Sequence, residues 1–183
     1  LDTIPEEIAY KAKAILVSYP ANPVSASVRP EFYPKLIAWA KKYNVIVIHD
    51  NAYSEMTFEG FEGTSFLCFD GAKEVGVEFN SLSKAYNLTG ARISFCIGNK
   101  DIISMFKKLR SQIDYGVFLP IQYAAIAALN SPMDNIEKNR EEYRLRREVL
   151  SEEFSKAGWN VKLSTGSMFM WTKIPDKYTN SND

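Results

Sequence analysis

Polar and reactive side chains follow several apolar stretches of this chain, at the points where those stretches end. Lys84 carries an amine, which can form a Schiff base with an aldehyde. Asp50 carries a carboxylate, which can pair with a protonated pyridine nitrogen and make that ring an electron sink. The hydroxyls of Ser81 and Ser83 and the planar guanidinium of Arg92 suit a phosphate group. These residue types predict chemistry on a phosphorylated pyridine that bears an aldehyde.

Two further side chains complete the set. Asn22 and Tyr53 can donate hydrogen bonds to a phenolate oxygen. Together with the first group, they match the ring nitrogen, aldehyde, phenolate and phosphate of pyridoxal 5′-phosphate (PLP). Taken singly, each residue would be ordinary: a solvated lysine, a helix-capping aspartate, turn serines or a surface arginine. The combination is what indicates a cofactor site.

The apolar stretches are expected to form the strands that position these residues. Residues 14–20, 45–50 and 75–83 are apolar runs with polar residues or proline at their ends, which is typical of buried parallel strands. Residues 30–43 have apolar side chains near helical spacing and predict an amphipathic helix. Strand, helix and strand make a βαβ unit. Ligands of such sheets bind at the carboxyl ends of the strands, where the polar set lies.

The rest of the chain predicts one further strand, three helices and the start of a strand pair. Residues 91–98 are strand-like, and residues 100–113 and 119–129 predict helices. Residues 131–158 begin with a serine suited to an N-cap, followed by proline, and close on a glycine. They predict one helix of about 26 residues, roughly 39 Å long. Residues 159–174 are expected to start a pair of strands.

Three motifs between Tyr19 and Arg92 resemble the fold-type I, class I/II aminotransferases. "YPANPVS" resembles the family's Tyr-Pro-x-Asn-Pro-Thr-Gly loop, and "HDNAYSEMTF" resembles its Asp-x-x-Tyr strand end. "SLSKAYNLTGARI" resembles its Ser-x-Ser-Lys and downstream Arg signature, with the family's gap of eight residues between Lys84 and Arg92. The resemblance extends along nearly the whole chain and is closest to the LL-diaminopimelate and aspartate-type branch.

This resemblance implies a role for each residue of the set. Lys84 would bind PLP as a Schiff base, and its freed amine would later move the proton between the substrate Cα and the cofactor. Asp50 would pair with the pyridinium nitrogen, and Asn22 and Tyr53 would hydrogen-bond the phenolate. The Asn22–Pro23 bond would be a candidate cis peptide. The phosphate would be bound by Ser81, Ser83 and Arg92.

The resemblance also implies an architecture. Residues 1–130 would belong to the PLP-binding large domain, a three-layer α/β/α domain with a mostly parallel sheet. Residues 131–158 would be a long connecting helix, and residues 159–183 would start a smaller α+β domain. The enzyme would be a homodimer acting on an amino acid and a 2-oxo acid. The family's glycine-rich phosphate turn, ring-stacking aromatic and substrate-binding arginine would lie outside these 183 residues.

Two departures from the family pattern bear on loop shape. Val24 and Ser25 stand where the family has Thr-Gly, so a glycine is lost and the turn chemistry changes. Gly90 precedes Ala91 where many relatives have a bulky aromatic. Neither departure removes a predicted cofactor contact, but both are expected to influence substrate choice.

Composition excludes several other functions. The 22 basic and 22 acidic residues balance, so no excess charge points to nucleic acid or to a membrane surface. Cys68 and Cys96 are expected to be buried free thiols in the cytoplasm. His49, the single histidine, lies in an apolar strand and predicts a hydrogen-bonded core residue. One histidine and two distant cysteines predict no metal site.

Two other functions stay open at this stage. A PLP-dependent C–S β-lyase of the cystathionine-lyase kind would share the fold and the motif around Lys84. A non-catalytic aminotransferase-like domain would keep the fold as a binding or regulatory module. The complete set of polar residues argues against the second.

Overall fold

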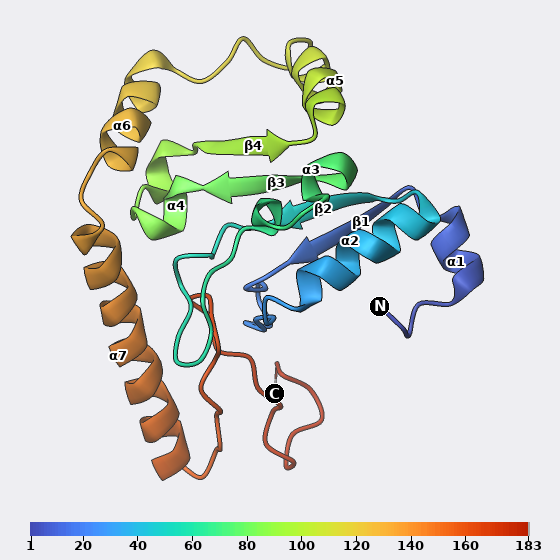
Figure 1. The fold of residues 1–183 in the computed structure, drawn as a ribbon. Coiled ribbons are helices and arrows are strands. Elements are labelled where there is room, and N and C mark those ends of the chain that lie inside the picture. Colours follow the sequence, from blue (N-terminus) through green and yellow to red (C-terminus); the bar gives the residue numbers. More distant parts are fainter. Residues whose placement is uncertain (183) are drawn as a thin grey trace.

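One mixed sheet carries the strand-end residues. The computed structural model describes residues 1–182. Strands β1 (Ala14–Ser18), β2 (Ile46–Asp50) and β3 (Gly76–Ser81) run parallel, and β4 (Ser94–Gly98) pairs antiparallel with β3 (Figure 1). The fold is therefore α/β with a mostly parallel sheet, as predicted. The carboxyl ends of the three parallel strands meet at one edge of the sheet.

Helix α2 (Phe32–Tyr43) connects β1 to β2 and confirms the predicted βαβ unit. Its apolar stripe packs on one face of the sheet, because residues three and four apart share a helix face. The helix ends at Asn44, which adopts a left-handed conformation with φ of 54°. The buried core of this face comprises Val17, Tyr33, Leu36, Ile37, Ala40, Val47, Phe66 and Ala72.

The remaining helices surround the sheet or extend beyond it. Phe106 of α5 (Lys100–Arg110) contacts Phe79 of β3 at 5.7 Å between ring centroids. Val47 belongs to the core under α2 and pairs with Gly76 of β3, three residues before Phe79. Because side chains of a strand alternate between the two faces, α5 packs on the face away from α2. The helices are α1 (Glu6–Lys11), η1 (Phe66–Cys68), α3 (Ala72–Val75), α4 (Leu82–Ala85), η2 (Thr89–Ala91), α5 (Lys100–Arg110), α6 (Leu119–Leu129) and α7 (Asp134–Lys156).

The long helix α7 begins later than predicted. Its N-cap is Met133, without a side-chain cap, rather than Ser131. The Ser131 hydroxyl instead donates to the Ala128 carbonyl at 2.7 Å, so this serine closes α6 and does not start α7. The predicted closing glycine is confirmed: Gly158 has a φ of 84°.

Two backbone hydrogen bonds complete the end of α7. Gly158 N–H donates to Ser155 O at 3.0 Å, and Trp159 N–H donates to Phe154 O at 2.8 Å. This is the Schellman pattern, and the expected apolar contact accompanies it: the Phe154 and Trp159 rings lie 5.0 Å apart.

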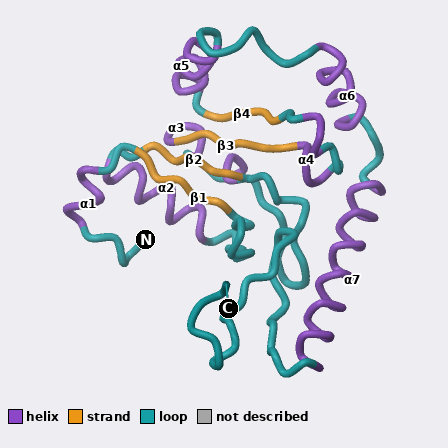
Figure 2. The backbone as a smooth tube through the Cα atoms, turned by 180° about the vertical axis from the view of Figure 1, so that it is seen from behind, coloured by secondary structure: helices purple, strands orange, loops and turns teal. Residues whose placement is uncertain are grey.

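The predicted strand pair within residues 159–174 is wrong. This segment forms no strand and makes one isolated bridge, between Thr57 and Gly166, as the loop colouring of Figure 2 also shows. Its backbone groups bond to the loop after β2: Phe58 N–H donates to Thr165 O at 3.1 Å, and Ser167 N–H donates to Met56 O at 2.7 Å. Because these partners use the backbone groups, they are not free to form a hairpin.

Two smaller expectations also change. Cys68 is exposed and Cys96 is half-buried, so the two free thiols are not both buried as predicted. Strand β3 ends at Ser81 because α4 starts at Leu82, which places Lys84 on a short helix.

Among residues 1–182, no helix is both long and apolar enough to cross a lipid bilayer.

Candidate active site

The sheet places Asp50 and Ser81 at its carboxyl edge, each as the last residue of its strand. Asp50 lies opposite Ser18 in the neighbouring strand, and the Ser18 hydroxyl donates to Asp50 Oδ2 at 3.4 Å. The Ala52 backbone N–H donates to Asp50 Oδ1 at 3.3 Å. Both carboxylate oxygens therefore accept a hydrogen bond, and these two bonds fix the orientation of Asp50 at the carboxyl edge of the sheet.

A cleft of about 250 Å³ opens at this edge. It contains four of the predicted site residues, which come from three segments of the chain. Phe79, Asn80 and Ile93 also line it. A larger hollow of about 440 Å³ lies between residues 54–63 and α7 and contains none of the predicted residues. The four predicted residues in the 250 Å³ cleft are Asp50, Ser81, Ser83 and Arg92.

Hydrogen bonds hold the Ser81 hydroxyl, the Ser83 backbone and the Arg92 guanidinium in place. The Ser81 hydroxyl accepts from Ser83 N–H at 3.1 Å and caps α4. The Thr89 hydroxyl donates to Ser83 O at 2.9 Å, and Arg92 Nη1 donates to Thr89 O at 3.1 Å. Arg92 has a φ of 53°, an uncommon conformation for a residue other than glycine. The turn after α4 thus links both serines to Arg92.

Lys84 lies beside this cleft on α4. Its Nζ lies 5.9 Å from the centre of the Tyr53 ring. Asn139 of α7 donates its side-chain N–H to Lys84 O at 2.9 Å and to Ala85 O at 3.4 Å. Because the last carbonyls of a helix have no partner within it, α7 satisfies these groups and fixes the short helix that carries Lys84.

Tyr53 joins Lys84 to the loop after β1. Its side chain is buried, and burial and the nearby Asp50 charge raise the pKa of its hydroxyl. A hydrogen bond with the Asn22 side chain opposes that rise. Asn22 itself is exposed, and the Asn22–Pro23 bond is cis, as predicted. Asn22, Tyr53 and Lys84 therefore form a second group of predicted residues beside the cleft.

Ser25 occupies the position where the family has glycine, and its backbone keeps a glycine-like conformation with φ of 60°. Its hydroxyl lies 2.7 Å from that of Ser167 and donates to Phe169 O at 2.6 Å. Ser25 and Ser167 are both buried. The serine side chain therefore ties the Asn22 loop to the segment after α7, a contact that glycine cannot make.

Two replacements of Ser25 distinguish the strain of its positive φ from the stability that its hydroxyl hydrogen bonds provide. Ser25→Ala is expected to destabilise the protein by about 1–3 kcal/mol, since the buried hydrogen bonds are lost. Ser25→Gly should cost about 1 kcal/mol less than Ser25→Ala, because glycine adopts positive φ without strain. Urea unfolding of the full-length variants measures both values. An alanine variant as stable as the glycine variant would contradict this explanation.

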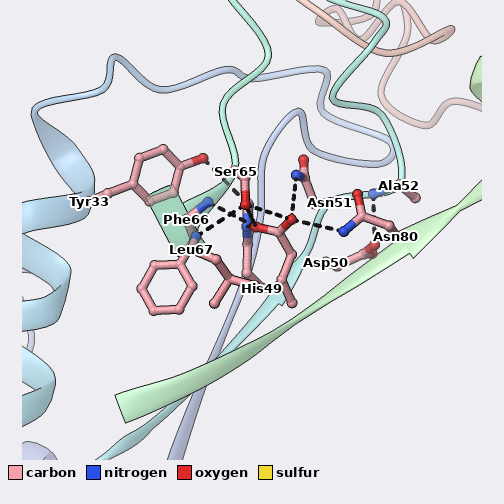
Figure 3. Close-up of polar contacts among 10 residues, drawn as sticks. Tyr33, His49, Asp50, Asn51, Ala52, Ser65, Phe66, Leu67 and Asn80 are labelled. Atoms are coloured by element: carbon pink, nitrogen blue, oxygen red, sulfur yellow. Dashed lines mark hydrogen bonds and ion pairs between the residues drawn. The ribbon is translucent and has the colours of Figure 1, made fainter. Parts of the chain in front are cut away.

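Two residues with structural importance at the site were not predicted from the sequence. Asn139 gives no local signal, because its partner lies 55 residues away. Glu78 does give one: it is an acid in an apolar strand, and the neighbouring strand contains the single histidine. The structure shows Glu78 hydrogen-bonded to His49 at 3.0 Å, within a buried polar network (Figure 3). The predicted hydrogen-bonded core role of His49 is confirmed.

Comparisons with known proteins show the family to which the chain belongs. The family described as "Aminotransferase class I and II" matches residues 1–182. The chain is 45% identical over 181 residues to LL-diaminopimelate aminotransferase of Halothermothrix orenii, covering 99% of this chain and 46% of that protein. It is 42% identical over 168 residues to glutamate-pyruvate aminotransferase AlaC of Escherichia coli, covering 92% of this chain and 41% of AlaC.

A solved structure matches as well. Apo-BacF from Bacillus subtilis superposes with a TM-score of 0.95 at 33% sequence identity, covering 100% of this chain and 46% of BacF. The chain thus spans about half the length of the relatives it matches. With the family match along residues 1–182, the conclusion is that this chain belongs to the aminotransferase class I and II family.

Proposed function

We propose that this chain is part of a PLP-dependent aminotransferase of amino-acid biosynthesis, which moves an amino group between an amino acid and a 2-oxo acid. The observation that carries the proposal is the group of residues at the carboxyl edge of the sheet. There, one cleft gathers an acid, two hydroxyls and a guanidinium, and Lys84 lies beside it. The family to which the chain belongs depends on PLP.

The donor set of the cleft fits this cofactor. Ser81, Ser83 and Arg92 supply hydroxyl donors and a cation, which a phosphate requires. Asp50 supplies the only carboxylate among the residues that line this cleft, and its negative charge suits a protonated ring nitrogen. Positive and negative protein groups thus share the cleft in the combination that PLP would need.

Each residue then has a specific task. When bound, PLP supplies an electron sink for the electrons of a bond broken at the substrate α-carbon. Lys84 holds the cofactor through its amine and later accepts and returns the α-proton. Asp50 keeps the ring nitrogen protonated, and Asn22 and Tyr53 hydrogen-bond the phenolate oxygen. Ser81, Ser83 and Arg92 bind the phosphate.

We extend the proposal to the domains. Residues 1–130 would form part of the PLP-binding large domain, residues 131–158 the connecting helix, and residues 159–183 the start of a small domain. Helix α7 supports this division, because it runs from α6 along the side of the molecule to the final segment (Figure 1).

The full-length protein is proposed to be a cytoplasmic homodimer. The support for a second subunit is the apolar surface of α5 and α6, where Leu109, Tyr123 and Ile126 are more than half exposed. A surface of this kind is typical of interfaces between proteins. Sedimentation of the full-length protein measures its subunit number.

The visible spectrum of the full-length protein with PLP tests the cofactor assignment. Wild-type protein is expected to show the absorption band of lysine-bound PLP, and Lys84→Ala should abolish it. Lys73→Ala, which removes an exposed lysine of α3, is the matched control and should keep the band. A band that survives in Lys84→Ala would overturn the role of Lys84.

An assay with and without an acceptor tests the reaction. An aminotransferase consumes an amino donor only when a 2-oxo acid is present. The lyase alternative would release pyruvate and ammonia from cystathionine without any acceptor. The donor panel begins with LL-diaminopimelate and glutamate, because the similar proteins are named for these substrates.

A further inference from the structure

The carboxylate of Glu78 is the centre of a buried polar network. Glu78 lies in the middle of β3 and is 1% exposed. Its two oxygens accept hydrogen bonds from five groups, and Figure 3 labels the residues that supply them. The partners are His49 Nδ1 at 3.0 Å, Asn51 Nδ2 at 3.1 Å, Asn80 Nδ2 at 2.8 Å, the Ser65 hydroxyl at 3.0 Å and Phe66 N–H at 2.8 Å.

The partners of Glu78 adjoin the predicted site residues in sequence. His49 and Asn51 flank Asp50 on its two sides, and Asn80 directly precedes Ser81. Side chains of a strand alternate between the two faces of the sheet. Glu78 and His49 therefore lie on the face covered by α2, while Asp50 and Ser81 point to the cleft on the other side; Asn80 bonds to Glu78 and also lines the cleft.

Ionisation makes this carboxylate a strong acceptor. Burial by itself would raise the pKa of Glu78, but the hydrogen bonds from His49, Asn80 and Asn51 outweigh it and lower the pKa to about 2. An ionised carboxylate only accepts hydrogen bonds, so His49 Nδ1 carries the proton in its bond to Glu78. Such charge-assisted bonds are about twice as strong as neutral ones.

The network also connects the sheet to its covering elements. The hydroxyl of Tyr33, from α2, lies 3.5 Å from His49 Nε2. Ser65 and Phe66 attach the start of η1 to the same carboxylate. One side chain thus joins the end of β2, the end of β3 and the layer that covers them.

We propose that Glu78 is a positioning residue for the cofactor cleft. Its carboxylate binds the side chains of the two residues that flank Asp50 and of the residue that precedes Ser81. It thereby fixes the position of Asp50 relative to the phosphate-binding residues. The inference rests on the proposed PLP function. It adds a residue that touches neither cofactor nor substrate and acts from the opposite face of the sheet.

Variants of two residues that bind Glu78 distinguish a role in positioning the cofactor site from a role in stability alone. Asn51→Ala removes a donor next to Asp50, on the face away from the cleft. Ser65→Ala removes a donor to the same carboxylate, but one that lies in the loop before η1 and adjoins no predicted site residue. A purely structural network would make the two variants alike. Glu74→Gln, in an exposed ion pair with Lys41, is the general control.

Three quantities are measured on full-length protein: unfolding without PLP, the PLP dissociation constant, and the pH midpoint of the visible band of bound PLP. Asn51→Ala is expected to weaken PLP binding about tenfold, as outer partners of binding groups do elsewhere. It should also shift the pH midpoint, because Asp50 moves relative to the ring nitrogen. Glu78→Gln should act in the same direction. Ser65→Ala and Glu74→Gln should leave affinity and midpoint unchanged.

The outcomes divide clearly. Wild-type affinity and midpoint in Asn51→Ala, or equal losses in Ser65→Ala, would overturn the positioning role while leaving the PLP function intact. A wild-type protein without the Lys84-dependent band would overturn both proposals. Reduced unfolding stability in both variants, with altered PLP binding only in Asn51→Ala, is the expected result.

Discussion

Asp50→Asn is expected to lower kcat of the full-length protein about 10²–10³-fold, the usual loss when one preorganised electrostatic contact of a transition state is removed. The substitution keeps the shape of the side chain but removes its negative charge. A neutral amide cannot hold the ring nitrogen in its protonated form, so the electron sink of the cofactor weakens. Because the acid acts on the reacting state, kcat should fall far more than KM rises.

The Asp50 result needs a control that changes charge alone. Asp70→Asn makes the same change at an exposed position before α3 and should leave kcat unaltered. In Asp50→Asn the amide oxygen can accept from the Ala52 N–H, and the amide N–H can donate to the Ser18 hydroxyl, so the fold should persist. Steady-state kinetics on both variants provide the measurement. A kcat for Asp50→Asn within about threefold of wild type would refute its role, since it amounts to less than 1 kcal/mol.

Glu78→Ala is expected to reduce the free energy of unfolding by about 3–5 kcal/mol, the usual cost of removing one partner of a buried ionic network. His49, Asn51 and Asn80 would lose their acceptor inside the protein, where water cannot replace it. Glu74→Ala removes an exposed ion pair with Lys41 and should cost less than about 1 kcal/mol. Urea or thermal unfolding of the full-length proteins compares them.

The Glu78 contribution should also depend on pH in a defined direction. The pKa of this carboxyl is lowered from 4.5 to about 2 in the folded state. A lowered pKa stabilises the fold above the unfolded value of 4.5, and that stability is lost as pH falls toward 2. The shift corresponds to about 3 kcal/mol. The stability difference between wild type and Glu78→Ala should therefore shrink across this window, and a constant difference would contradict the ionised network.

Local patterns in the sequence predicted most of the elements near the site. Apolar runs predicted β1, β2 and β3, and helical spacing predicted α2, because periodicity and propensity act over a few residues. The polar residues after the strands could be placed together, since parallel strands share a carboxyl edge. The motifs around Asn22, Asp50 and Lys84 indicated the family that the comparisons confirmed.

Features that depend on partners far along the chain could not be predicted in this way. Residues 159–174 have a strand-like sequence, but the loop after β2 takes their backbone hydrogen bonds. Ser131 resembles an N-cap, yet its hydroxyl finds a carbonyl of α6 first. Such choices depend on which partner is nearest in space, and spacing in the sequence does not contain that information.

The same limit applies to the residues that support the site. The types of Lys84 and Asp50 were enough to suggest their chemistry, because an amine or a carboxylate has that chemistry wherever it lies. The positions of Glu78 and Asn139 mattered only once the chain had folded. Glu78 could have been a costly isolated charge in a strand, and it is stabilised because folding brings donors from β2, β3 and the start of η1 to its oxygens.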